Sequence, residues 1–247
     1  MSINRFARFL LVTAAFYFNH SAHAAAVYPI NNAAILAGSK FDIKVEFSQA
    51  VNLEEVVIDI NGSPSNKLIT AKPEFIPNEN GKGSSILFRD VQLTKAGKYQ
   101  VVARTPQERL QVTWDVYASG PRRVKNVILF IGDGMTIANR TAARVLSKGI
   151  VEGKYQGKLA FDDMPSTAMI GTSGSDSLIT DSANSMSAYT TGHKTAVNAM
   201  GVYVSRASDN LSHPKVETIT ELVKRNTNMS VGIVSDAELQ DATPGAM

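Results

Sequence analysis

The stretch KFDIKVEF, residues 40–47, alternates apolar and charged side chains with a period of two. In an extended chain the apolar residues lie on one face: Phe41, Ile43, Val45 and Phe47. The charged residues lie on the opposite face: Asp42, Lys44 and Glu46. This alternation is typical of a β-strand that packs one face against a hydrophobic core. The stretch therefore predicts a sheet in this part of the chain.

Similar runs follow and predict an all-β sandwich over residues 27–118. They are separated by turn-rich pieces such as NGSPSN and PNENGKGS, and they cover residues 56–60, 85–88, 99–103 and 110–116. The piece LTKAGKY, which ends at Tyr99, resembles the corner of immunoglobulin-like and fibronectin-type domains, where a tyrosine hydroxyl bonds back to the main chain. Trp114 alternates with Val112 and Val116, which predicts a core position for its indole.

The periodicity changes at YASGPRRVKN, residues 117–126, which we interpret as a linker. The elements expected after it are a strand over 124–131, a helix over 137–148 ended by Gly149, a helix after Pro214 and an apolar strand over 229–235. In the first helix, Val145 and Leu146 are expected to face inward. Strands that alternate with helices are typical of a parallel sheet with crossover helices, so residues 119–247 predict an α/β domain.

Residues 1–24 have the pattern of a secretory signal peptide. Arg5 and Arg8 precede an apolar run over residues 9–18, and the small-residue pattern AHA ends at residue 24. An alternative is a membrane anchor or an ordinary N-terminal helix, but the apolar run falls short of the roughly 20 residues that span a bilayer. We therefore expect a periplasmic or secreted protein with no membrane span once the signal is removed.

The charge of the mature chain is close to neutral. Loss of Arg5 and Arg8 lowers the basic residues from 25 to 23, against 22 acidic residues. This balance gives no reason to expect nucleic acid or an anionic membrane as a partner. The chain has no cysteine, so its core and any bound ions must stabilise it without disulfides.

The apolar stretch NVILFIGDGM, residues 126–135, delivers one carboxylate, Asp133, to the expected carboxyl edge of the sheet. Ligands of open α/β sheets bind at that edge. The flanking Gly132 and Gly134 let the main chain come close to an ion or a phosphate. Taken alone, GDG is more typical of a tight turn whose aspartate caps the next helix.

The stretch SLITDSANSMSAYTTGHKT, residues 177–195, places Ser182 at the start of an expected helix over 183–189. Free amides and the helix dipole favour anion binding at such a position. The alternative is that Asp181 and Ser182 only cap the helix, which is the commoner role of such a pair.

A nucleophilic Ser182 needs a base or a metal to help remove its proton. The mature chain has two histidines, His193 and His213, and neither gives a Ser-His-Asp order. Activation of Ser182 by a bound metal is the remaining possibility, with Asp133 as the first ligand.

The final stretch SDAELQDATPGAM, residues 235–247, offers further oxygen donors after the last expected strand: Asp236, Glu238, Asp241 and Thr243. Asp241 and Thr243 stand two residues apart and suit a hard ion such as magnesium. The alternative is an acidic loop exposed to solvent.

Three of these pieces together resemble bacterial alkaline phosphatases. FIGDGM, TDSA with TTGHKT, and ELQDATP are similar to segments of that family and occur in the same order within residues 124–247. The resemblance implies an incomplete alkaline-phosphatase-like α/β domain, and it does not extend to the β-sandwich. It further implies a metal-dependent phosphomonoesterase that acts on a small phosphate monoester through a phosphoserine intermediate. A homodimer is the candidate assembly.

The resemblance also implies a role for each matched residue. Ser182 corresponds to the catalytic nucleophile, whose oxygen also contacts zinc. Asp133 corresponds to the aspartate that bridges one zinc and the magnesium, and Asp241 and Thr243 correspond to the magnesium-site pair. The implied cofactors are two zinc ions and one magnesium ion per site.

The match is imperfect behind the nucleophile, because the family has small residues where Asn184 and Met186 stand and threonine where Ser187 stands. His193 has no ligand role to carry over, and a surface or helix-end histidine is the simpler interpretation. The family takes its zinc-binding histidines and its phosphate-binding arginine from later in the chain. We therefore expect an N-terminal fragment, or an incomplete gene product, with negligible turnover on its own.

Two other functions stay open at this point. One is a non-catalytic extracellular binding module in which the sandwich is the functional part. The other is a phosphodiesterase or sulfatase of the same superfamily, although those relatives usually attack with Thr or a modified Cys where this chain has Ser182. The physiological substrate does not follow from the sequence.

Overall fold

The computed structural model describes residues 25–247, so the expected signal peptide, residues 1–24, lies outside the described residues. The chain divides into two compact units, and each unit is made of several separate stretches of the sequence. The sandwich unit holds the described residues before 34, residues 41–116 and the segment 205–214. The helical unit holds residues 34–40, 117–204 and 215–247. Segment 205–214 therefore belongs to the sandwich unit, although its neighbours on both sides along the chain belong to the helical unit.

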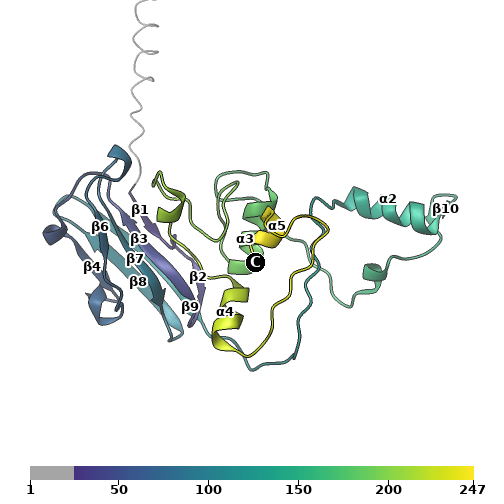
Figure 1. Cartoon of the computed structure of the whole chain (residues 1–247), viewed down its shortest axis with the longest axis horizontal. Helices are drawn as coiled ribbons and strands as arrows, with labels where there is room; N and C mark the ends of the chain where they lie inside the picture. Colours follow the sequence, from purple (N-terminus) through teal and green to yellow (C-terminus); the bar gives the residue numbers. More distant parts are fainter. Residues whose placement is uncertain (1–24) are drawn as a thin grey trace, which may run out of the picture. The chain divides into compact units, whose positions relative to one another are not determined.

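The strands described before residue 118 form two sheets (Figure 1). One sheet has the order β1-β3-β7-β6, with β1 at Ala26–Tyr28, β3 at Lys40–Glu46, β7 at Ser85–Gln92 and β6 at Glu74–Ile76. The other has the order β2-β9-β8-β4-β5, with β2 at Ala34–Leu36, β9 at Arg109–Tyr117, β8 at Gly97–Arg104, β4 at Val57–Ile60 and β5 at Ser63–Pro64. Short 3-10 helices lie at Leu53–Glu55, Ser65–Lys67 and Glu79–Gly81. The strands β8 and β9 pair antiparallel from Gly97↔Val116 to Arg104↔Arg109. This arrangement is the predicted all-β sandwich.

The core of the sandwich unit follows the alternation seen in the sequence. The apolar residues of the 40–47 stretch are at most 2 % exposed: Phe41, Ile43, Val45 and Phe47. Trp114 is fully buried, and its indole N–H donates to the carbonyl of Pro29 at 2.9 Å. The Tyr99 hydroxyl donates to the carbonyl of Lys95 at 2.9 Å, which confirms the predicted tyrosine corner.

The charged face of β3 is buried as well. Asp42, Lys44 and Glu46 are each at most 3 % exposed. Period-two alternation predicts two chemically different faces, but it does not say what covers the polar one. Here segment 205–214 covers it, with the Lys44 ammonium donating to the Ser205 hydroxyl at 2.9 Å.

The helical unit carries four α-helices among its described residues (Figure 1): α2 Ile137–Lys148, α3 Ser182–Thr191, α4 Ile219–Asn226 and α5 Ala242–Gly245. A hairpin of β10, Ile150–Val151, and β11, Lys154–Tyr155, follows α2, and a 3-10 helix at Ala160–Asp163 comes next. Within residues 25–247 no helix combines the length and the apolar character needed to cross a membrane.

Helix α2 has the predicted bounds, but its packing differs from the expectation. Thr136 caps its first turn, and Gly149 ends it with a φ of 80°. Leu146, expected to face inward, is 87 % exposed. Ion pairs from Arg140 and Arg144 to Asp162, at 2.8 and 2.6 Å, attach the helix to the following segment. Val145 is half-buried, so the inward assignment was wrong for Leu146.

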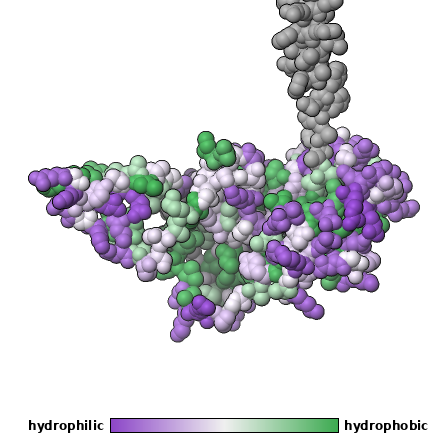
Figure 2. Space-filling view, turned by 180° about the vertical axis from the view of Figure 1, so that it is seen from behind, coloured by the Kyte–Doolittle hydropathy of each residue, from purple (hydrophilic) through white to green (hydrophobic). Residues whose placement is uncertain are grey.

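Two expected strands are absent from the described structure. Residues 124–131 and 229–235 contain no strand, and Phe130 and Val234 are 87 % and 99 % exposed. A strand requires a neighbouring strand to accept and donate its main-chain hydrogen bonds. Among residues 25–247 no strand pairs with either segment, so the parallel sheet does not form there. Figure 2 shows apolar patches, in green, on the surface.

Candidate active site

Asp133 lies in a tight turn that sets its carboxylate out from the main chain. The Met135 amide donates to the Gly132 carbonyl at 3.2 Å, and Gly134 has a φ of 65°. A residue with a side chain is disfavoured at such a φ, so the second glycine of GDG is required by the turn itself. Asp133 is exposed, which leaves its carboxylate accessible to ligands.

Ser182 is the first residue of α3, and its hydroxyl donates to Oδ2 of Asp133 at 2.8 Å. The position of Ser182 is fixed by the N-cap residue before it. Asp181 Oδ1 accepts the amide of Asn184 at 2.8 Å, and Asn184 Oδ1 accepts the amide of Asp181 at 3.1 Å. Asp181 Oδ2 also accepts a hydrogen bond from the amide of Asn198 at 2.5 Å, so both carboxylate oxygens of Asp181 bind backbone amides.

Thr243 completes the cluster, because its hydroxyl donates to the same Oδ2 of Asp133 at 2.7 Å. It lies on α5, which is connected to α3 by a buried hydrogen bond from the Thr190 hydroxyl to the Ala246 carbonyl at 2.7 Å. Residues separated by 49 and 110 positions along the chain therefore meet at one carboxylate oxygen. We call Asp133, Ser182 and Thr243 the carboxylate cluster.

The two hydroxyl donors change the acidity of Asp133. Hydrogen bonds from Thr243 and Ser182, with a further one from the Gly134 amide, hold the pKa of the Asp133 carboxyl below its usual value. Donors stabilise the ionised form of a carboxylate, so Asp133 is charged at neutral pH. A carboxylate with a lowered pKa is a weak base. The arrangement can therefore orient the Ser182 hydroxyl, but Asp133 is poorly suited to take its proton.

The donor set of the carboxylate cluster suits a hard cation. Magnesium is bound by carboxylate and hydroxyl oxygens, and Asp133 and Thr243 supply one of each. Zinc takes four ligands that commonly include histidine. The described residues 25–247 contain no group of three His, Cys, Asp or Glu that could hold a metal ion. The cluster thus fits part of a metal site and supplies only oxygen ligands.

The other predicted donors near the end of the chain lie differently. Asp241 is the N-cap of α5, and its Oδ1 accepts the amide of Ala242 at 2.7 Å. Asp236 and Glu238 are exposed in the preceding turns. The structure therefore brings Thr243 to Asp133 directly and places Asp241 at the start of the same helix.

The two histidines of the described chain have structural partners. His193 Nδ1 and the Tyr203 hydroxyl are 2.5 Å apart, and burial lowers the pKa of His193 to about 4. Burial also raises the pKa of Tyr203, so a protonated phenol lies against a neutral imidazole. His213 Nδ1 lies 3.0 Å from the Ser205 hydroxyl. Each imidazole has a partner outside the carboxylate cluster.

Sequence reasoning missed the supporting role of Asn184. It stood out only as a departure from small residues, yet its amide oxygen closes the capping box around Asp181. The spacing Asp-x-x-Asn before a helix is a capping pattern, so this contact had a signal in the sequence. The hydrogen bond between Thr190 and Ala246 had no signal in the sequence, because the two residues are 56 positions apart.

A family model described as "Alkaline phosphatase" matches residues 124–247. An alkaline phosphatase of Escherichia coli (strain K12) is 40% identical over 129 residues, which are 50% of this chain and 25% of that protein. Alkaline phosphatase H of Pseudomonas aeruginosa is 38% identical over 132 residues, 51% of this chain and 25% of that protein. Alkaline phosphatase 4 of Drosophila melanogaster is 30% identical over 145 residues, 58% of this chain and 24% of that protein. The chain spans about a quarter of the length of these relatives.

Solved structures resemble the sandwich. An Ig-like domain of human Obscurin-like protein 1 has a TM-score of 0.28 at 12% identity and covers 43% of this chain and 98% of that chain. A chimeric titin Z1Z2 has a TM-score of 0.25 at 16% identity and covers 39% of this chain and 97% of that chain. The sandwich is defined by its own strand order.

Proposed function

Because the chain belongs to the alkaline phosphatase family, whose model matches residues 124–247, we propose that these residues supply the nucleophile and part of the metal site of a phosphomonoesterase. The family places the chain among phosphatase-type hydrolases. The finer assignment, a metal-dependent enzyme that works through phosphoserine on a small phosphate monoester, is supported by the carboxylate cluster.

Ser182 is the proposed nucleophile. Its oxygen attacks phosphorus, the bond to the leaving alcohol breaks, and a phosphoserine forms that water then hydrolyses to free phosphate. Asp133 holds the hydroxyl by accepting its hydrogen bond at 2.8 Å. The position of Ser182 at the start of α3 favours the negative charge of a phosphoryl group, because the first turn of a helix carries partial positive charge.

Metal ions are the proposed cofactors. Asp133, Thr243 and Asp241 would help to hold magnesium, and Asp133 with Ser182 would contact zinc. Bound ions supply Lewis-acid stabilisation and lower the pKa of an attacking oxygen. The chain's own residues bring together one carboxylate and two hydroxyls, so further ligands must join them.

The cellular setting follows from the same proposal. The pattern of residues 1–24 supports export, so we place the enzyme in the periplasm or outside the cell. A homodimer remains the proposed assembly.

The single observation that carries the proposal is that Ser182 and Thr243 both donate to Oδ2 of Asp133. The test is an aryl phosphate assay, with zinc and magnesium, of a protein that joins residues 124–247 to the downstream metal ligands of the family. We expect Ser182→Ala to lower kcat by at least roughly 10³-fold, the size of loss seen when a catalytic nucleophile is removed. Acid quenching and peptide mass spectrometry should find phosphate on Ser182.

Ser185→Ala is the matched control, because Ser185 lies on the same face of α3 and donates to the Asp181 carbonyl rather than to Asp133. This variant should keep its activity and its phosphoserine. Hydrolysis that is equally strong in Ser182→Ala, or phosphate found on another residue, would show that Ser182 is not the nucleophile.

A further inference from the structure

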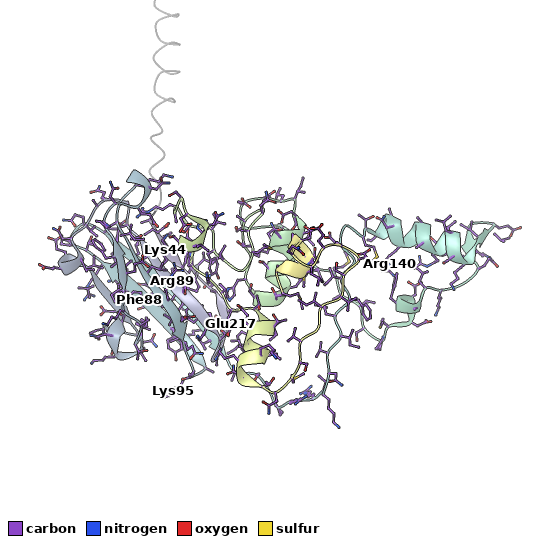
Figure 3. All side chains as sticks on the ribbon, in the orientation of Figure 1. Lys44, Phe88, Arg89, Lys95, Arg140 and Glu217 are labelled. Carbon is purple, nitrogen blue, oxygen red and sulfur yellow. The ribbon has the colours of Figure 1, made fainter. Side chains whose placement is uncertain are left out.

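A buried group of charges in the sandwich unit has no part in the proposed chemistry. Lys44 of β3 has a fully buried side chain, and its ammonium lies 2.7 Å from Glu79 and 3.4 Å from Glu46. The side chains of Glu46 and Glu79 are only 4 % and 6 % exposed. Lys44 lies on the same sheet as Arg89 of β7 (Figure 3). Charges removed from water to this degree are stable only when each has close partners.

The second cation of this group is Arg206, which comes from segment 205–214. Its side chain is 6 % exposed, and its guanidinium lies 3.4 Å from Glu79. It also donates to three main-chain carbonyls of the sandwich unit, at 2.6 Å to Phe47, 3.2 Å to Lys82 and 2.5 Å to Ser84. The Arg206 amide donates to Glu46 at 3.0 Å. A planar guanidinium with five donors suits such a set of acceptors, which one ammonium could not satisfy.

The rest of segment 205–214 adds contacts of the same kind. Lys44 donates to the Ser205 hydroxyl at 2.9 Å and to the Ser212 carbonyl at 3.4 Å. Arg89, which pairs with the buried Asp42 at 2.8 Å, donates to the Leu211 carbonyl at 3.0 Å. The bonds to Ser212 and Leu211 join side chains of the sandwich to main chain of the segment, so the sandwich contacts the segment's backbone as well as its arginine.

The charges balance only when the segment is present. Lys44 and Arg206 face Glu46 and Glu79, two cations against two carboxylates. Without Arg206 the sandwich would bury two carboxylates against one lysine and leave three carbonyls without their donor. Burial alone would raise the pKa of Glu79, but the hydrogen bond and charge of Lys44, helped by Arg206, hold that pKa below its usual value. The charged face of β3 is therefore built for a cationic partner.

The origin of that partner in the chain matters. Residues 205–214 lie inside the stretch that matches the alkaline phosphatase family, not in the sandwich sequence. Both ends of the segment are fixed in the helical unit, where Val202 bridges to Lys215 and the Val216 amide donates to the Gly201 carbonyl at 2.8 Å. The segment is thus a loop of the phosphatase-family sequence that folds as part of the sandwich.

We infer that the β-sandwich is an intramolecular docking domain whose ligand is segment 205–214 of the same chain, with Arg206 as the anchor. Its polar face is occupied by this chain and is not available to a wall polymer or a protein partner. The sandwich and the segment stabilise each other. This inference does not depend on the proposed reaction.

The test uses Trp114, the one tryptophan of the chain, which is fully buried in the sandwich core. Thermal unfolding of the full chain is followed by Trp114 fluorescence in wild type, Arg206→Gln and Arg144→Gln. Arg144 also pairs with a carboxylate, but within the helical unit. Arg206→Gln should lower the Trp114 midpoint by roughly 10 °C or more, because it leaves buried acceptors unpaired. Arg144→Gln should leave that midpoint unchanged.

Two further measurements test the docking role of Arg206 even if Arg206→Gln folds poorly. In wild type the Arg206 amide should exchange with solvent as slowly as amides of β3, because a buried carboxylate accepts its hydrogen bond. In a double-mutant cycle, Glu79→Gln should cost less in the Arg206→Gln background than in wild type. Fast exchange at Arg206, or a Trp114 midpoint equally insensitive to both arginines, would overturn the docking role.

Discussion

At Asp133 a single carboxylate oxygen accepts two hydroxyl protons, one from Ser182 and one from Thr243. The pair of donors keeps the carboxylate ionised, and the Ser182 hydroxyl is oriented by its hydrogen bond to Asp133. Residue types and their places after apolar stretches made all three candidates, and the family resemblance tied them to one site. The capping of α5 by Asp241 was not foreseen, because two residues of spacing fit a metal pair and a helix cap equally well.

His193 gives a prediction about pH at the residue scale. Burial lowers its pKa to about 4, against about 6.5 in the unfolded chain. Between these values the unfolded chain binds a proton that the folded chain does not. Stability that is complete above about pH 6.5 therefore falls as the pH drops toward 4, by about 2 kcal/mol at pH 5. NMR titration of the imidazole should place its midpoint near 4, and a midpoint near 6.5 would show that the ring is not buried against Tyr203.

At the scale of elements, α3 illustrates how a short polar stretch sets a helix start. The capping box of Asp181 and Asn184 begins the helix, and Gly192, with a φ of 78°, ends it. Its sequence is rich in small and hydroxyl residues and has no strong apolar stripe. Its position therefore depends on the cap and on packing against α5.

Substitutions of Asp181 should show whether its hydrogen-bond acceptor or its negative charge stabilises the start of α3. Asp181→Ala removes the acceptor for the Asn184 and Asn198 amides and should cost about 1 kcal/mol of helix stability. Asp181→Asn keeps an amide oxygen that can cap, so it should cost clearly less. Hydrogen exchange of the α3 amides measures both. Equal protection in wild type and Asp181→Ala would mean that the cap does not hold this helix.

Elements were predicted well where local signals were complete. The bounds of α2 follow from a cap at Thr136 and a stop at Gly149, and the sandwich strands follow from alternation and turns. The stretches 124–131 and 229–235 are just as apolar, yet they form no strand in the described chain. A parallel strand depends on neighbours that are distant in sequence, so an apolar run alone does not decide its state.

At the scale of the whole molecule, each of the two units is built from stretches that are not continuous in the sequence. The strand β3 looked like an ordinary half-buried strand, and its charged face gave no sign of the segment that covers it. Arg206 lies some 160 positions from Glu46, and no local pattern links them. The residues of the carboxylate cluster are also far apart along the chain, by 49 and 110 positions, but there the family resemblance supplied the link that local reasoning could not.

The central claim is that Asp133, Ser182 and Thr243 meet in the folded chain, and the acidity of Asp133 tests it most directly. Carboxyl NMR titration should be recorded for wild type, Ser182→Ala, Thr243→Val and the control Ser185→Ala. Loss of a donor destabilises the carboxylate, so the pKa of Asp133 should rise in the first two variants, most in Thr243→Val, and stay unchanged in the control. An Asp133 titration that is the same in all four proteins would contradict the account.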